Sequence, residues 1–372
     1  MWETVQLGDL CEILDTRRKP ITKKDRIHGE YPYYGATGIV DWVVDYIFDE
    51  ELVLIGEDGA KWDAGEKTAF IVDGKYWVNN HAHVVKPNTE KLLNKWLTYY
   101  LCGVDLKPWV TGMTVPKLNQ GQLKSIPIPL PPLAEQQRIV AKLDAAFAEI
   151  DEAIETTNES LKSIQQLFLT SLDTLVNADD LGESIPLGEI CELAQGLAIN
   201  KGTKHLLVGN SSKPLIRIKD LVNETEEQYI TDEYENTKTE VNEEDLIFTR
   251  TGSLGLVFRG RKGVLHNNSF KVTPNQAISR DYLYWWLKNP SFLDSIHKIS
   301  GKAAQPDISH KLFKAQQIKV PTAAKQKDIV AKIELLFKQI EKMKKINLHK
   351  LNQIHALKSA MLFQELQLSE AA

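Results

Sequence analysis

The chain has 372 residues, 42% of them hydrophobic and 26% charged, which is enough apolar material for two ordinary cores and excludes a disordered protein. The formal net charge of -5 excludes a protein that coats nucleic acid indiscriminately, because phosphate binding needs clustered Lys and Arg. The N-terminus has no basic stretch before an apolar run, and no run of about 18 apolar residues occurs. We therefore expect a cytoplasmic protein without a membrane partner.

The first 132 residues show the pattern of a globular domain made of short strands broken by Gly, Asn and Asp. In chain order they contain an opening segment, a basic loop, a strand with two histidines, an aromatic helix, a polar loop and a proline-rich exit. These segments are "VQLGDLCEI" (residues 5–13), "TRRKPITKKDR" (16–26), "WVNNHAHVV" (77–85), "WLTYYL" (96–101), "TGMTVPKLN" (111–119) and "SIPIPLPP" (125–132). The exit is followed by the pattern of a helix of about 45 residues, so the prolines end a domain and begin a spacer.

The same order of segments returns after residue 178. The matching segments are "IPLGEICEL" (residues 185–193), "VLHNNSFKV" (264–272), "YLYWWL" (282–287) and "SGKAAQPDIS" (300–309). A second exit, "QIKVPTAAKQKDIV" (317–330), leads into a second long helix that repeats the "IVAK" of residues 139–142 at residues 329–332. The loops between the matched segments differ, which is typical of one scaffold adapted to two ligands.

Both helices carry apolar residues at alternating steps of three and four, which predicts a coiled-coil seam. The predicted seam residues are Leu143, Phe147, Ile150, Ile154, Thr157, Leu161, Ile164 and Phe168 in the first helix, and Ile333, Phe337, Ile340, Asn347, Leu351, Ile354 and Met361 in the second. In the second helix a small rotation would let Met343 and Leu357 replace Lys344 and Lys358. Thr157 and Asn347 are equivalent under the repeat, and we expect them to face each other and fix the register.

The charges of the two helices also predict that they pair with each other. The first helix is acidic between residues 149 and 159, and the second is basic between residues 338 and 350. Each helix leaves its own domain through a similar exit, so antiparallel pairing would relate the two halves by an approximate two-fold axis. The sequence therefore predicts an α+β fold. Two similar α/β-mixed domains (residues 1–132 and 179–322) are joined by two long antiparallel helices (133–178 and 323–372) that form an intramolecular coiled coil with pseudo-two-fold symmetry.

Motifs for catalysis are missing from the sequence. Base methyltransferases carry an Asn or Asp followed by Pro-Pro and an aromatic residue, together with a Gly-rich loop for the methyl donor. "LPPLAEQ" (residues 130–136) has the prolines without the amide or the aromatic ring, and no G-x-x-x-x-G-K-[ST] phosphate loop occurs. Cys11, Cys102 and Cys191 are far apart and form no Cys-x-x-Cys pair. We predict that the chain is not an enzyme and holds no metal.

The two histidines of the "NNHAH" segment suggest one alternative to that prediction. His81 and His83 would point to the same face of a strand, where Glu57 or Asp58 could join them around a metal ion. The second unit has no histidine at the matching positions. Hydrogen bonding is therefore the interpretation that we favour.

Local basic, aromatic and hydroxyl side chains give each unit a candidate surface for DNA. In the first unit the candidates are Arg17, Arg18, Lys19, Lys23, Lys24, Arg26, Tyr33, Tyr34, Thr37, Trp62, Thr114 and Lys117. In the second unit they are Lys201, Lys204, Arg217, Lys219, Arg250, Thr251, Ser253 and Lys302. A solvated charge run is the alternative for the basic loop. We interpret the Asn pairs, residues 79–80 and 267–268, as turn residues, with adenine reading as the alternative.

Together these segments resemble the DNA-specificity subunit of type I restriction-modification systems. The resemblance lies in the repeated "LGDLCE" and "LGEICE" openings, the "IPIPLPPLAEQQRIVAKLD" exit, and the alternation of domain and helix over nearly the whole chain. "LIGEDGA" (residues 54–60) with "WVNNHAHV" is also similar to one recurrent class of target recognition domain. The second exit departs from the family pattern because it lacks the Pro-Pro-Leu signature.

The resemblance implies a non-catalytic subunit with two target recognition domains, each of which reads one half of a bipartite, asymmetric DNA target. The conserved helices would set a nonspecific spacer between the halves. The implied partners are double-stranded DNA, two methyltransferase (M) subunits and two restriction (R) motor-nuclease subunits. S-adenosylmethionine, ATP and Mg would be bound by those subunits, and adenine N6 would be methylated in each half, on opposite strands.

Three other interpretations stay open from the sequence. One is the specificity subunit of a type IIB-like system, in which nuclease and methyltransferase are fused into one partner. Another is a coiled-coil scaffold whose ends bind proteins, which the net acidity favours and the basic loop opposes. The last is a self-sufficient methyltransferase, which the missing motifs oppose.

The mapping of the second domain generates a prediction for Arg250. Replacing Arg250 by Ala should relax or abolish recognition of one half of the target and leave the other half unchanged, since Arg suits the reading of guanine. Sequencing of methylated motifs reports on both halves at once. Loss of both halves together would instead implicate folding or assembly.

Overall fold

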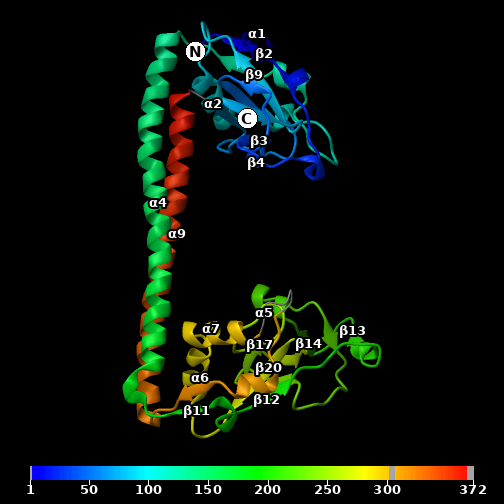
Figure 1. Ribbon diagram of the computed structural model, residues 1–372, viewed down its shortest axis with the longest axis vertical. Coiled ribbons are helices and arrows are strands. Elements are labelled where there is room, and N and C mark those ends of the chain that lie inside the picture. The colour runs from blue at the N-terminus through cyan, green and yellow to red at the C-terminus, as the bar shows by residue number, and fades with distance from the viewer. Residues whose placement is uncertain (1, 301–305, 367–372) are drawn as a thin grey trace. The chain divides into compact units, whose positions relative to one another are not determined.

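The computed structural model describes residues 2–300 and 306–366 and divides the chain into two compact units (Figure 1). Unit 1 contains Met1–Asn158 and Leu348–Ala372, and unit 2 contains Glu159–Asn347. Each unit therefore holds one globular domain and a part of both long helices. Among the described residues we find no helix with both the length and the apolar character that crossing a bilayer requires.

The domain of unit 1 consists of three small sheets and three short helices. One sheet has the order β2-β9-β6-β7, another has the order β4-β3-β8-β5 with β3 parallel to β8, and β1 pairs with β10. The strands are β1 Thr4–Gln6, β2 Cys11–Ile13, β3 Tyr31–Gly35, β4 Gly38–Val43, β5 Phe48–Asp49, β6 Leu52–Gly56, β7 Ala69–Val72, β8 Lys75–Val78, β9 Ala82–Pro87 and β10 Pro127–Pro129. The helices are α1 Leu7–Leu10, α2 Asn94–Gly103, α3 Gln120–Lys124 and the long α4 Leu133–Asn177.

The domain of unit 2 repeats this plan. Its sheets have the orders β12-β20-β17-β18 and β13-β15-β14-β19-β16, with β14 parallel to β19, and β11 pairs with β21. The strands are β11 Ser184–Pro186, β12 Cys191–Gln195, β13 Leu207–Val208, β14 Lys213–Ile216, β15 Tyr229–Ile230, β16 Glu240–Val241, β17 Leu246–Thr249, β18 Val257–Phe258, β19 Gly263–Leu265, β20 Ser269–Pro274 and β21 Gln317–Lys319. The helices are α5 Ile218–Asn223, α6 Arg280–Trp286, α7 Pro290–Ile299, α8 His310–Lys314 and the long α9 Ala323–Glu365.

The central strand of each domain separates two hydrophobic cores. In β6, Val53 and Ile55 belong to the core that contains the helices, while Leu52 and Leu54 belong to a core under the second sheet. Successive side chains of a strand point to opposite faces, so a strand covered on both sides is apolar throughout. The same holds for β17, where Phe248 and Ile247 lie in different cores. The short strands and the mixture of helices and strands in each domain, both predicted from the sequence, are confirmed.

Each proline-rich exit is a strand that pairs with the opening strand of its own domain. Thr4 lies opposite Pro129 and Gln6 opposite Pro127, and β11 and β21 are paired in the same antiparallel way. Proline lacks a backbone N–H, so it is tolerated in these two-stranded edges and not in a sheet interior. The chain thus enters and leaves a domain at adjacent strands, and the long helix begins directly after the exit.

A buried glutamine fixes the start of each long helix. Gln136 is fully buried; its Oε1 accepts a hydrogen bond from the N–H of Leu93 at 2.9 Å, and its Nε2 donates to Lys91 O at 2.8 Å and Pro131 O at 2.9 Å. One amide therefore joins the exit, the start of α2 and the first turn of α4.

Gln326, which is equivalent under the repeat, makes the same set of bonds in unit 2. It accepts from Ser279 N at 2.7 Å and donates to Ala277 O at 3.0 Å and Pro321 O at 2.8 Å. The second exit lacks the Pro-Pro-Leu signature, yet the amide that orients the helix is retained.

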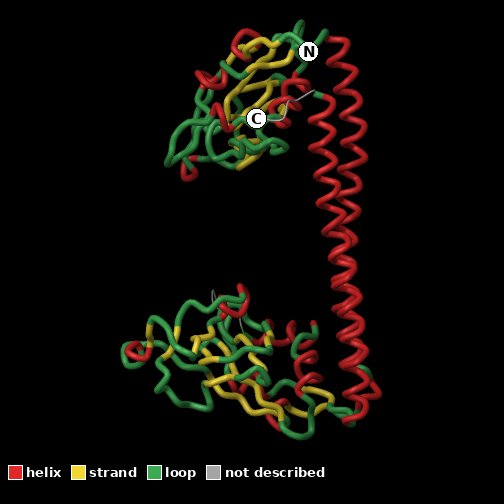
Figure 2. The backbone as a smooth tube through the Cα atoms, turned by 180° about the vertical axis from the view of Figure 1, so that it is seen from behind, coloured by secondary structure: helices red, strands yellow, loops and turns green. Residues whose placement is uncertain are grey.

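The two long helices run antiparallel within each unit, as Figure 2 shows in red. In unit 1, Lys142 pairs with Glu365 and Asp151 with Lys358, each at 2.6 Å. In unit 2, the rings of Phe168 and Phe337 lie 5.6 Å apart. The predicted pairing of the helices within one chain is confirmed.

The salt bridges between the helices differ from those that the charge pattern predicts. Asp151 pairs with Lys358, so the acidic residues 149–155 lie alongside residues 353–359, beyond the basic stretch at 338–350. Lys344 pairs instead with Glu341 of its own helix, at 3.0 Å. The rotation that would place Met343 and Leu357 in the seam is also wrong, because both are exposed while the stem of Lys358 is half-buried. The ammonium of Lys358 lies 4.8 Å from the ring centre of Phe147, which explains why a lysine occupies this position.

Most of the predicted seam is buried or half-buried. In α4 this applies to Leu143, Phe147, Ile150, Ile154, Thr157, Leu161, Ile164 and Phe168, and in α9 to Ile333, Ile340, Asn347, Leu351, Ile354 and Met361. Phe337 is 38% exposed. Leu172, Val176 and Leu362 are buried although the seam omits them, because the ends of the helices pack against the domains and present a wider apolar face.

The two polar seam residues each bond to their own helix. Thr157 is buried, and its Oγ1 donates to Ala153 O at 2.7 Å. Asn347 is half-buried, and its Nδ2 donates to Met343 O at 3.0 Å. That the two side chains face each other stays a prediction.

The buried glutamines predict a matched pair of destabilising substitutions. Replacing Gln136 or Gln326 by Leu keeps the apolar packing but leaves buried backbone groups without partners, so each change should lower the free energy of unfolding by about 1–3 kcal/mol. Denaturant titration measures this, with the exposed neighbour Gln137→Leu as the control at about 0.5 kcal/mol or less. An equal loss from Gln137→Leu would show that the buried amide has no special part.

Candidate nucleic-acid interface

The basic loop of unit 1, residues 14–29, is fixed to the domain by its backbone. The indole N–H of Trp77 donates to Lys19 O at 2.6 Å. The hydroxyl of Tyr33 accepts from the N–H of Ile21 at 2.9 Å, and Nε of Arg26 donates to Ile21 O at 3.0 Å. A loop tied at these points presents its remaining side chains in defined places.

The arginines of this loop are held by acidic partners. Arg17 pairs with Glu50 at 3.2 Å and lies over the ring of Phe48, and Arg26 pairs with Asp41 at 3.0 Å. Arg18 is the most enclosed, with a side chain that is 13% exposed and lies 2.5 Å from Glu57 and 3.3 Å from Asp15. Their charges are neutralised within the domain, so the prediction that they contact DNA receives no support from this geometry.

The lysines of the loop remain available. Lys19, Lys23 and Lys24 are exposed, and none forms an ion pair with any residue that the structure describes. Thr37, at the turn between β3 and β4, is exposed as well. These four residues face solvent without an ion-pair partner among the described residues, while Arg17 is 46% exposed but paired with Glu50.

Two of the predicted aromatic contacts are wrong because the side chains belong to the core. Tyr33 is 1% exposed and Trp62 is 8% exposed, with the indole N–H of Trp62 donating to Gly56 O at 3.3 Å. Tyr34 is half-buried and packs against Phe70 and Tyr76. None of the three rings is free to stack on a base.

Trp42 is an exposed aromatic side chain that was not predicted from the sequence. It is 43% exposed on β4, beside Ile39 at 48% and Val40 at 52%. β4 is the last strand of its sheet, and its "GIVDWV" pattern fits a strand. An apolar strand that lies at the edge of a sheet without a covering element indicates an exposed apolar surface, and this pattern could have identified these residues.

Four segments of unit 1 meet at a buried cluster of charged groups. Nδ1 of His83 lies 2.6 Å from Asp15 Oδ2, and its Nε2 lies 2.7 Å from Leu118 O. Lys117 Nζ lies 3.0 Å from Glu57 Oε1. Burial alone would raise the pKa of Asp15, but the hydrogen bond and charge of His83, together with Arg18, hold that pKa below its ordinary value.

This cluster resembles a metal site in its spacing but not in its surroundings. Ligand atoms of Asp15, Glu57 and His83 lie within 4.8 Å of one another. Arg18 and Lys117 already neutralise the two carboxylates, and two fixed cations would repel a metal ion. The structure therefore favours hydrogen bonding and ion pairing, the interpretation favoured from the sequence.

The other histidine of that segment, His81, does not lie on the strand face where the metal alternative placed it. His81 is exposed in the turn before β9, where its ring pairs with Asp58. Its neighbour Asn79 is buried, and the Asn79 Oδ1 accepts from the N–H of His81 at 2.7 Å. This bond is the turn role that was predicted for Asn79.

The polar loop after residue 110 lies next to the cluster. Thr114 is exposed in it, between the exposed side chains of Met113 and Val115. The loop folds back on itself, with backbone hydrogen bonds between Thr111 and Lys117 at 2.7 and 2.8 Å. Lys117 is thus used inside the domain, while Thr114 is presented to solvent.

The candidates of unit 2 divide in the same way. Arg217 pairs with Asp220 at 2.6 Å, Lys219 pairs with Glu227, and Arg250 pairs with Asp307 through two bonds of 2.9 and 2.6 Å. Thr251 donates its hydroxyl to Asp307 at 2.7 Å. The exposed candidates without such a partner among the described residues are Lys201, Lys204 and Ser253, while Lys219 is exposed but paired. Lys302 lies outside the described residues.

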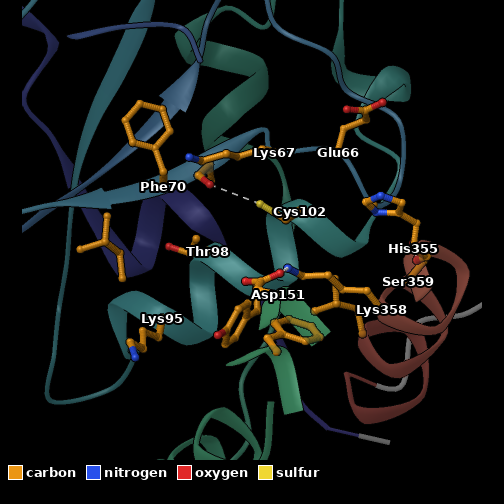
Figure 3. A pocket seen from close by; sticks show the side chains of 16 residues that line it. Glu66, Lys67, Phe70, Lys95, Thr98, Cys102, Asp151, His355, Lys358 and Ser359 are labelled. Atoms are coloured by element: carbon orange, nitrogen blue, oxygen red, sulfur yellow. Dashed lines mark hydrogen bonds and ion pairs between the residues drawn. The ribbon is translucent and has the colours of Figure 1, made fainter. Parts of the chain in front are cut away.

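A cavity of about 560 Å³ lies between α2, β7 and the long helices of unit 1 (Figure 3). Lys358 and Asp151 lie side by side in its lining and form an ion pair. The Sγ of Cys102 lies 3.3 Å from Ala69 O, and burial raises the pKa of this thiol, which leaves it protonated and unreactive. Ser359, one helical turn after His355 in the lining, donates its hydroxyl to the backbone O of His355 at 3.2 Å.

The equivalent place in unit 2 is filled by aromatic rings. Phe168, Trp285 and Phe337 pack with ring centres 5.4 to 5.9 Å apart. Under the repeat they correspond to Lys358, Tyr99 and Phe147 of unit 1. Of these three positions, only the one with Lys358 in unit 1 and Phe168 in unit 2 changes from a charged to an aromatic side chain.

The family model for the type I restriction modification DNA specificity domain matches residues 1–163 and 182–350, one copy in each half of the repeat. The chain belongs to this family. It is 30% identical over 294 residues to a putative type I restriction enzyme specificity subunit of Haemophilus influenzae, covering 76% of this chain and 75% of that protein. It is 25% identical over 348 residues to a putative type I specificity subunit of Mycoplasma pneumoniae, covering 90% and 89%.

Solved structures share the fold. A chain from "Structural basis underlying complex assembly and conformational transition of the type I R-M system" has a TM-score of 0.75 at 18% identity, covering 98% of this chain and 97% of that chain. The HsdS subunit from Thermoanaerobacter tengcongensis has a TM-score of 0.52 at 18% identity, covering 99% and 97%. The α+β fold and the assignment as a non-catalytic specificity subunit, both predicted from the sequence, are confirmed by these relatives.

The exposed lysines generate a prediction about salt dependence. If Lys23 and Lys24 contact phosphates, replacing both by Gln should reduce the slope of log affinity against log salt by about 2, since each contact contributes about 0.9. Duplex binding by the assembled complex measures the slope. Lys91→Gln, an exposed lysine after β9, is the control and should leave the slope unchanged. An unchanged slope in the double variant would assign the loop to solvent.

Proposed function

We propose that this specificity subunit binds double-stranded DNA with both domains at once, each reading one half of a bipartite, asymmetric target. Residues 1–132 and 179–322 would be the two target recognition domains. The helices at residues 133–178 and 323–372 would set the spacer between the half-sites.

The observation that carries the proposal is one topology with two different surfaces. Both domains have the same strand order around the central strand, but their exposed side chains differ: unit 1 presents Lys23, Lys24 and Trp42, whereas unit 2 presents Lys201, Lys204 and Ser253. Backbone contacts position a protein on DNA, and side chains in loops distinguish bases. Different loops on one scaffold support two different half-sites, hence an asymmetric target.

The partners follow from the family and from one face of α9. Leu335 and Ile346, in the part of α9 that belongs to unit 2, are 60% and 57% exposed and lie eleven residues apart, which is three helical turns and therefore one side of the helix. Exposed apolar residues in a row mark a protein contact. We assign this row to two methyltransferase subunits, with two motor-nuclease subunits joining the restriction complex. S-adenosylmethionine, ATP and Mg would be bound by these partners.

The test is detection of N6-methyladenine at single-molecule resolution in DNA from cells that carry this gene and its methyltransferase partner, compared with cells that lack only this gene. We expect a gapped, asymmetric motif, methylated on opposite strands in its two halves, that disappears with the gene. Supplying the gene again should restore it.

Other outcomes would overturn parts of the proposal. A palindromic motif would contradict two different half-sites. An unchanged pattern of methylation would contradict the specificity role and favour a protein scaffold. A partner in which nuclease and methyltransferase share one polypeptide would replace the type I complex by a type IIB-like one.

A further inference from the structure

Each domain has one backbone junction at which the loop after the central strand meets the polar loop that precedes the exit. In unit 1 the N–H of Glu57 donates to His81 O at 2.9 Å, and the O of Glu57 accepts from Leu118 N at 2.8 Å. In unit 2 the N–H of Arg250 donates to Asn268 O at 2.8 Å, and the O of Arg250 accepts from Ile308 N at 3.2 Å.

An isolated β-bridge completes the match between the junctions. Asp58 is bridged to Lys117 in unit 1, and Thr251 is bridged to Asp307 in unit 2. Glu57 and Arg250 therefore occupy one structural position, and Lys117 and Asp307 occupy another. The backbone of the junction is the same in both domains.

The charges at these two positions are reversed. In unit 1 the acid is on the central-strand side and the base on the polar loop, with Lys117 Nζ 3.0 Å from Glu57 Oε1. In unit 2 the base is on the central-strand side and the acid on the polar loop, with Arg250 and Asp307 joined by bonds of 2.9 and 2.6 Å. We call the first pair clasp 1 and the second pair clasp 2.

The residue beneath each clasp changes with its charge. His83 lies beneath clasp 1, with its Nδ1 3.9 Å from Glu57 Oε2. Phe270 takes this place on β20, and the guanidinium of Arg250 lies over its ring, 5.4 Å from the centre. An imidazole can donate to a carboxylate, and an aromatic face attracts a cation. Three positions thus differ together between two copies of one arrangement.

The carboxylate of Asp307 in clasp 2 is ionised at neutral pH. Burial alone would raise the pKa of Asp307, but the hydrogen bonds from Arg250 and Thr251 outweigh burial and lower that pKa. The Arg250 side chain is 16% exposed, and its Nε and Nη2 both point to Asp307. This ion pair uses one edge of the guanidinium and fixes its plane against the polar loop, although the Nη1 edge keeps free donors.

We propose that Arg250 and Asp307 of clasp 2, like Glu57 and Lys117 of clasp 1, are positioning residues that hold two DNA-facing loops together, and that Arg250 does not read a base. The proposal rests on the proposed DNA-specificity function. It replaces the sequence interpretation of Arg250 as a reader of guanine. What the scaffold requires at this junction is an opposite pair of charges, in either order.

The experiment exchanges the charges of clasp 2 for those of clasp 1. Arg250→Glu and Asp307→Lys are made singly and together, and adenine methylation by the complex with its methyltransferase subunits is measured over all sequences of the half-site. Each single change places two like charges side by side and should lower methylation by about tenfold or more. The double variant, completed by Phe270→His so that the new glutamate does not lie over an aromatic face, restores the arrangement of clasp 1 and should recover most of the activity with the same motif.

Three controls keep the outcomes distinct. Arg259→Ala removes another surface ion pair of unit 2, with Asp281 at 2.6 Å, and should leave the motif and the rate unchanged. Asp307→Asn should weaken recognition of one half-site only, because it removes the charge that holds Arg250. Thermal unfolding of each variant separates loss of recognition from loss of folding.

Base reading by Arg250 predicts the opposite results. In that case the double variant stays inactive or changes specificity at one base pair, because a glutamate cannot replace the donors of Arg250. Either result from a folded variant would overturn the proposal. If the wild-type complex methylates no defined motif, the DNA-specificity function itself fails, which is a separate result from a failed rescue.

Discussion

The arrangement of each domain on its helix depends on one buried side-chain amide. Gln136 and Gln326 each bond to the exit strand and to the start of the aromatic helix from the first turn of a long helix. Losing its hydrogen-bond partners costs a buried amide more free energy than it costs an exposed amide, because water cannot replace those partners. The direction in which each domain leaves its helix is therefore specified by polar bonds as well as by apolar packing. The position of the loops of each domain therefore depends on that direction.

The sequence predicted features that arise from local pattern and from repetition. The two domains, the helix starts and most of the seam follow from periodicity, which is a property of neighbouring residues. The enclosed arginines could not be predicted in this way, since Arg18 meets Glu57 across 39 positions of the chain. The prediction that Trp62 contacts DNA was wrong because only the tertiary fold shows that this side chain is buried, with its indole N–H bonded to Gly56 at the end of β6. Lys358 appeared to interrupt the seam, and only its stacking over Phe147 explains it.

One distant relation was nevertheless visible in the sequence. Aligning the two halves places Glu57 against Arg250 and Lys117 against Asp307, so that both charges change sign together. A single reversal would suggest a change of ligand, whereas a double reversal indicates two residues in contact. The internal repeat thus supplies a comparison of two sequences within one chain.

The pairing of each opening strand with its own exit strand bears on how new specificities arise. The chain enters a domain at Thr4–Gln6 and leaves it at Pro127–Pro129, and these segments lie side by side. Everything between them can be exchanged for another domain with the same opening and exit, without altering either long helix. Because unit 2 is closed in the same way, each domain can be exchanged independently of the other. Under the proposed function, recombination between such genes would multiply the available targets, whereas point mutation would have to rebuild each loop in turn.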